Sequence, residues 1–128
     1  MAIEQYQPGV CNIGGPEVAR RKKVAQLGSV FFLALSGYLL LSGSAASSAA
    51  LAFGPALIAA VGFVQSRKKF CFAFGLLGTF NFAELGKISK VLSQEEIAAD
   101  RRQALVIVVQ SIGLALVGTL VLAALLSL

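Results

Sequence analysis

The stretch VAQLGSVFFLALSGYLLLSGSAASSAALAFGPALIAAVGFVQS, residues 24–66, contains no Asp, Glu, Lys or Arg across its 43 positions. The hydrocarbon core of a bilayer is about 30 Å thick and takes about 20 helical residues, so this stretch has the length of two membrane spans and a turn. Its middle part, SGSAASS at 42–48, is small and polar, as is typical of a turn. We therefore predict spans over 24–41 and 49–66, with a kink at Pro55 in the second.

The C-terminal part of the chain is a third apolar stretch. Residues 103–128 carry no charged side chain, and their length predicts one span over 103–126. Over the whole chain 57% of the residues are hydrophobic and 13% are charged, which is about half the charged fraction of a soluble domain. A disordered chain is excluded as well, because such chains are poor in apolar residues. The sequence therefore predicts an all-α integral membrane protein, with a single membrane domain over 1–128.

A shorter charge-free run, residues 70–83, separates the second span from the third. Its 14 residues are fewer than a normal span needs, and basic side chains stand both before and after it. We expect an interfacial or re-entrant helix here, within a cytoplasmic segment over 67–102. The alternative is a fourth, short span over 70–92.

The distribution of Lys and Arg predicts the orientation of the chain. Basic clusters at 20–23, 67–69 and 101–102 flank the three spans, whereas the Ser-rich turn has no basic residue. By the positive-inside rule, residues 1–23 and the 67–102 segment are cytoplasmic and the C-terminus is external. The four-span alternative would place several of these cations outside. We expect a retained first span rather than a secretory signal, and a location in a cell or organellar membrane.

Two local patterns predict helix boundaries. Gly-Gly-Pro at 14–16 favours the start of a helix that runs to about Leu41, because proline suits the first helical position. Ser93 and Glu96 have the spacing of a capping box. A helix from there to Leu128 would be about 54 Å long, which exceeds the thickness of the membrane.

Small residues recur every four positions on the second and third spans. Such spacing lets membrane helices approach closely, although Ala-rich helices also produce it by chance. The candidate packing residues are Ala52, Ala56 and Ala60, which follow Ser48 on the second span, and Ser111, Ala115, Thr119 and Ala123, which precede Ser127 on the third.

The 70–82 stretch is the most aromatic part of the chain and holds five of its nine Phe residues. It is either a partner- or lipid-binding surface, with aromatic rings at the acyl boundary and cations at the headgroups, or an ordinary amphipathic connector. The candidate contact residues are Phe70, Phe72, Phe74, Phe80, Asn81 and Phe82.

Few residues in the chain suit catalysis. The absence of histidine argues against a proton shuttle and a His-ligated metal or haem. Cys11 and Cys71 are two possible reactive thiols, or else small hydrophobic residues in local packing. The glycines at 9, 14 and 15 lack the context of a phosphate-binding loop. We therefore expect no catalytic residue, metal, nucleotide or nucleic acid, and no cofactor is predicted, with a bound lipid or pigment left open.

The leading hypothesis for function is a non-catalytic accessory or scaffold subunit of a larger membrane complex, in contact with other membrane subunits and anionic lipids. One alternative is a channel- or transporter-forming homo-oligomer. A further alternative is a thiol redox sensor that uses Cys11 and Cys71. The pore of the homo-oligomer would be lined by Gln26, Ser29, Gln110, Ser111 and Thr119.

Overall fold

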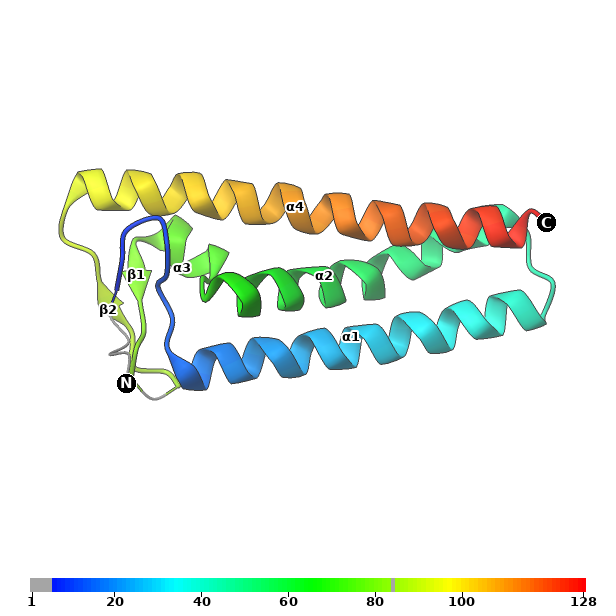
Figure 1. Ribbon diagram of the computed structural model, residues 1–128, viewed down its shortest axis with the longest axis horizontal. Helices are drawn as coiled ribbons and strands as arrows, with labels where there is room; N and C mark the ends of the chain where they lie inside the picture. Colours follow the sequence, from blue (N-terminus) through cyan, green and yellow to red (C-terminus); the bar gives the residue numbers. More distant parts are fainter. Residues whose placement is uncertain (1–5, 84) are drawn as a thin grey trace.

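The computed structural model describes residues 6–83 and 85–128 (Figure 1). Within them, three helices are long and apolar enough to cross a membrane, as the sequence predicts. The elements in chain order are α1 (Gly15–Leu41), the 3-10 helix η1 (Ala46–Ala52), α2 (Phe53–Lys68), α3 (Phe72–Leu77), β1 (Thr79–Phe80), β2 (Ser89–Lys90) and α4 (Gln94–Leu126).

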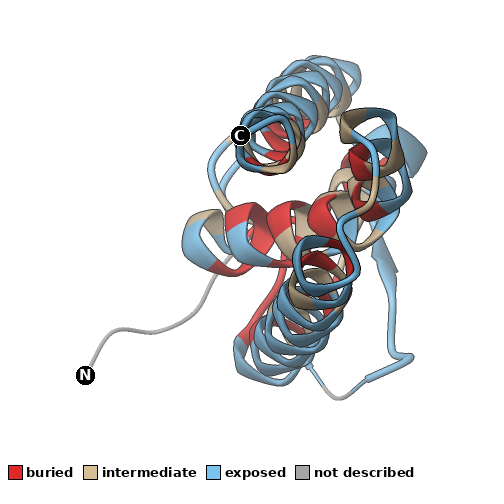
Figure 2. Ribbon diagram, turned by 90° about the vertical axis from the view of Figure 1, so that its right-hand side faces the viewer, coloured by how far each residue is buried: buried red, intermediate tan, exposed pale blue. Residues whose placement is uncertain are grey.

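The three long helices form an elongated bundle with α2 in the middle. Helix α2 packs along both α1 and α4, whereas α1 and α4 make little contact with each other. Figure 2 looks along the bundle and shows the buried residues on the sides of the helices that face one another. This arrangement leaves one side of α2 open between its two neighbours.

All three basic clusters lie at one end of the bundle, which we call the basic end. The start of α1, the end of α2 and the start of α4 meet there, together with α3, the two strands and residues 6–14, which we call the N-terminal segment (Figure 1). The C-terminus and the turn after α1 lie at the opposite end. The basic clusters are therefore confined to one end of the bundle, as the sequence pattern predicts.

The predicted ends of α1 are confirmed, and so is the N-cap of α4. Helix α1 begins at Gly15 and ends at Leu41. The Ser93 hydroxyl accepts a hydrogen bond of 3.4 Å from the backbone N–H of Glu96, which satisfies one of the donors at the helix start. Helix α4 ends at Leu126, whereas the sequence predicts a helix to Leu128.

The connection between the first two spans differs from the prediction. The turn ends at Ala45, and η1 carries residues 46–52 into α2 as a 3-10 helix. The kink expected at Pro55 stays a prediction. Pro55 lies in the first turn of α2, within one continuous helical segment over Ala46–Lys68.

Helices α1 and α2 approach so closely that their backbones touch. A Cβ atom placed on Gly28 would lie 2.5 Å from the backbone nitrogen of Ala59, and one on Gly62 would lie 2.6 Å from that of Ala25. Only glycine fits at both positions. Neither glycine was predicted from the sequence to be a packing residue.

The residues of the two small-residue stripes lie mainly inside the bundle. Ala52 at the end of η1 is buried, as are Ala56 and Ala60 of α2 and Ser111 and Ala115 of α4. Thr119 and Ala123 are half-buried. At the end of the bundle opposite the basic end, Ala49 and Ala52 pack against Leu39 and Leu122.

The 70–83 run forms less helix than predicted. Helix α3 has six residues and stops at Gly78, whose φ of +71° belongs to the left-handed region that favours glycine. The chain then makes a small antiparallel pair of strands, with Phe80 opposite Ser89. This two-stranded pairing was absent from the all-α prediction. It returns the chain to α4 at the same end of the bundle (Figure 1).

Candidate functional site

The N-terminal segment is joined to the basic end by two asparagines. The Asn12 side chain bonds the backbone of Cys71 twice: its Nδ2 donates to the carbonyl oxygen at 3.1 Å, and its Oδ1 accepts from the N–H at 2.7 Å. The backbone of Asn81 accepts from Gly14 and donates to Asn12, each at 2.8 Å. Both asparagines are buried, so these bonds replace water as their partners.

A buried carboxylate holds the beginning of the same segment. Asp100, on the first turns of α4, is fully buried and accepts hydrogen bonds from the Tyr6 hydroxyl at 2.5 Å and the Gly9 backbone N–H at 2.7 Å. The Tyr6 ring stacks on Phe80 with 4.7 Å between centroids. Burial, together with the hydrogen bond to Asp100, raises the pKa of the Tyr6 phenol above its usual value.

A second buried carboxylate is paired with an arginine one helical turn away. Glu17 is 2% exposed, and its Oε1 lies 2.7 Å from Nη1 of Arg21. The other terminal nitrogen of Arg21 donates to Sγ of Cys71 at 3.0 Å, and its guanidinium lies 5.8 Å from the centroid of the Phe74 ring. The more exposed Arg20 reaches the same Glu17 oxygen at 3.8 Å.

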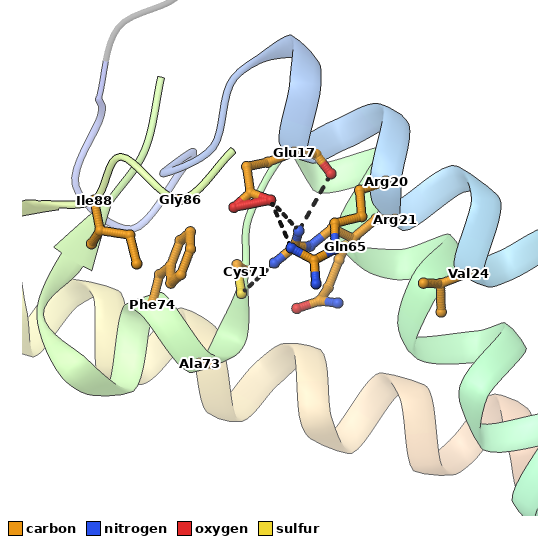
Figure 3. Close-up of a pocket in the computed structure, with 10 residues that line it drawn as sticks. All are labelled: Glu17, Arg20, Arg21, Val24, Gln65, Cys71, Ala73, Phe74, Gly86 and Ile88. Carbon is orange, nitrogen blue, oxygen red and sulfur yellow. Dashed lines mark hydrogen bonds and ion pairs between the residues drawn. The ribbon is translucent and has the colours of Figure 1, made fainter. Parts of the chain in front are cut away.

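These side chains border an open hollow of about 410 Å³ between α1, the end of α2 and α3, which we call the arginine hollow (Figure 3). Gln65 forms part of its wall, and its Oε1 accepts from the N–H of Phe72 at 2.9 Å. Among the described residues, no acceptor bonds the Gln65 amide nitrogen. The hollow is lined by Glu17, Arg20, Arg21, Val24, Gln65, Cys71, Ala73, Phe74, Gly86 and Ile88.

A second candidate surface lies between the two outer long helices. Two adjoining hollows of about 540 and 270 Å³ share Ser29, Ala59 and Leu114, and we call them together the α1–α4 groove. The floor is the alanine-rich side of α2. The groove is lined by Ala25, Gln26, Ser29, Val30, Phe32, Leu33, Ala56, Ala59, Ala60, Phe63, Leu114 and Gly118.

The aromatic residues singled out by sequence do not form one surface. Phe70 is fully buried in a cluster with Ile107, while Phe72 packs against the edge of that cluster. Phe74 faces the arginine hollow instead. Phe80 and Phe82 lie near each other, with ring centroids 6.2 Å apart.

The other candidate residues are also separated. Asn81 is buried as an internal tether, and its role toward a partner or lipid, like that of the Phe residues, stays a prediction. Cys71 is buried and Cys11 is half-buried, and they form no disulfide bond with each other. Of the five residues proposed to line a pore, Ser111 is fully buried and Thr119 donates to the carbonyl of Ala115. The other three, Gln26, Ser29 and Gln110, are exposed.

Apart from Asn81, the polar residues that build the basic end were not predicted from the sequence. Glu17 and Arg21 carry a usable signal, because opposite charges four positions apart meet on a helix. The spacing of Asp100 from Tyr6 carries none, because 94 residues separate them. Gln65 gives no signal either, since an amide at the end of a span is also suited to the membrane interface.

No protein-family model, curated protein or solved structure matches this chain. Within residues 6–83 and 85–128, no group of three His, Cys, Asp or Glu side chains could hold a metal ion. The arginine hollow and the α1–α4 groove are therefore the two candidate sites of the protein.

Proposed function

We propose that the protein is a multi-pass accessory or scaffold subunit of a larger membrane complex, and that a transmembrane helix of a different subunit fills the α1–α4 groove. The observation that carries this proposal is the groove itself. The groove runs between α1 and α4. Its floor consists of small side chains of α2, chiefly Ala56, Ala59 and Ala60.

The chemistry of the groove favours a helix over lipid chains. Membrane helices gain little hydrophobic free energy from associating, so they depend on close backbone approach and on hydrogen bonds between polar side chains. The alanine floor permits the close approach. Gln26 and Ser29 on the α1 wall offer exposed polar groups, and Gln110 lies one helical turn from Leu114 on the α4 wall. Acyl chains cannot hydrogen-bond to these groups.

Filling the groove should release the partner. Gly118 lines it, and a Cβ there would meet only Phe32, at 3.5 Å, so the backbone accepts a side chain at this position, and that of Gly118→Leu would occupy space that the partner needs. Overfilling a packed contact costs about 1–3 kcal/mol, so the affinity for the partner should fall about five- to 150-fold and less partner should be retained. The measurement is the stoichiometry of the complex purified in a mild detergent.

Gly113→Leu is the matched control, because a Cβ at Gly113 meets no atom within 4 Å and the residue lines none of the groove. A photo-crosslinking residue at Ser29 should capture one defined polypeptide, and one at the exposed Leu27 should not. Adducts to lipid alone at Ser29 would contradict the proposal. Adducts to a second copy of this chain would favour the pore-forming homo-oligomer.

We also propose that the basic end faces the cytoplasm and that residues 70–92 stay on that side of the membrane. The basic clusters at this end support the orientation. A reporter that works only in the cytoplasm should be active when fused after Leu92. A membrane-impermeant maleimide should label Ser44→Cys in intact cells. Activity of an exclusively external reporter after Leu92 would favour the four-span alternative instead.

A further inference from the structure

The arginine hollow presents hydrogen-bond donors around a space open to the outside of the bundle. Its charged groups are the two guanidiniums of Arg20 and Arg21 and the carboxylate of Glu17, so it carries one net positive charge. Gln65 adds an amide group that is 6% exposed and whose nitrogen bonds no acceptor among the described residues. An amide donor in the wall of the hollow that has no protein acceptor is a group that a ligand oxygen can satisfy.

The two arginines have different roles in this hollow. Arg21 is held by Glu17 and by Sγ of Cys71, and its side chain is 13% exposed. Arg20 has a side chain that is 63% exposed and only a long contact, 3.8 Å, to Glu17. Arg21 is thus a fixed wall of positive charge, and Arg20 is able to turn toward a ligand. Guanidinium groups suit phosphate oxygens because their donors match the geometry of that anion.

We infer that the arginine hollow binds the phosphate of an anionic phospholipid through Arg20, Arg21 and the Gln65 amide. The position of the hollow selects a lipid over a soluble phosphate. Its lining includes Val24, the first residue of the charge-free run of α1, so the hollow lies at the level where the apolar span begins. Phe74 and Ile88 supply apolar walls for the glycerol region beside the charged groups.

This inference concerns a different surface from the α1–α4 groove, and it holds whichever polypeptide fills that groove. The probe is short-chain dioctanoyl-phosphatidylglycerol, titrated into the detergent-purified protein and measured by calorimetry. Removing one charge-assisted hydrogen bond should weaken binding about tenfold or more in Arg20→Gln. Gln65→Glu should weaken it similarly, since it keeps the oxygen that accepts from Phe72 and turns the donor toward the ligand into a negative charge.

The control is Lys23→Gln, which removes one positive charge from an exposed residue of α1 outside the hollow. It should leave the affinity for the lipid within about twofold, because salt screens the attraction of an exposed charge that does not contact the ligand. Equal weakening by Lys23→Gln and Arg20→Gln would overturn the inference in favour of diffuse attraction. Binding of inorganic phosphate as tight as that of the phosphatidylglycerol would overturn the lipid assignment. Equally tight binding of dioctanoyl-phosphatidylcholine would remove the requirement for a net negative headgroup.

Discussion

Gly28→Ala and Gly62→Ala should each destabilise the bundle by about 1–3 kcal/mol, the usual penalty for overpacking. A methyl group at either position would meet backbone atoms of Ala59 or Ala25 at 2.5–2.6 Å, and backbone cannot move aside as a side chain can. The same substitution at Gly37 should stabilise the bundle instead. No atom lies within 4 Å of a Cβ there, and alanine stabilises a helix interior by about 0.5–1 kcal/mol relative to glycine.

The measurement is the temperature at which half of each purified variant is lost from its monodisperse peak in size-exclusion chromatography. All three substitutions add one methyl group to α1 or α2. Differences in stability among them therefore report the packing around each position and not the added group. A Gly28→Ala variant as stable as Gly37→Ala would mean that the two helices do not approach this closely. The proposed partner contact at Gly118 is unaffected by this comparison.

Helix boundaries were predictable from sequence where a local pattern determines them. The Gly-Gly-Pro start of α1 and the Ser93 cap of α4 depend on neighbouring residues alone, and both are confirmed. The 3-10 geometry of η1 was missed because its composition is equally compatible with a turn or a helix.

The arginine hollow and the polar tethers could be predicted only in small part. The pairing of Glu17 with Arg21 follows from helical spacing, but its burial depends on residues distant in sequence, because Cys71 and Phe74 pack beside Val18. One interpretation of the aromatic run over residues 70–82 was a surface of exposed rings for a partner or for lipid. Yet Phe70 is fully enclosed, because a short apolar segment at the end of a bundle can bury its rings inside the protein as well as in lipid.

Asp100→Ala should release the N-terminal segment from α4 while leaving the three long helices in place. It removes the acceptor of two hydrogen bonds, from the Tyr6 hydroxyl and the Gly9 N–H. A hydrogen bond to a charged group contributes about 1.5–3 kcal/mol, so the segment should lose at least about 2 kcal/mol of local stability. The loss is local because the released donors can reach water.

Hydrogen–deuterium exchange over residues 6–13 measures this release. Exchange of the Gly9 amide should speed up about thirtyfold in Asp100→Ala, which is the factor that corresponds to about 2 kcal/mol. Asp100→Asn should lie between that variant and the wild type, because its remaining side-chain oxygen still accepts from Gly9 and its new amide can donate to the Tyr6 oxygen. Glu95→Ala, at an exposed position on the first turn of α4, is the control and should leave the exchange unchanged. Unaltered protection in Asp100→Ala would mean that the asparagine tethers alone hold the segment.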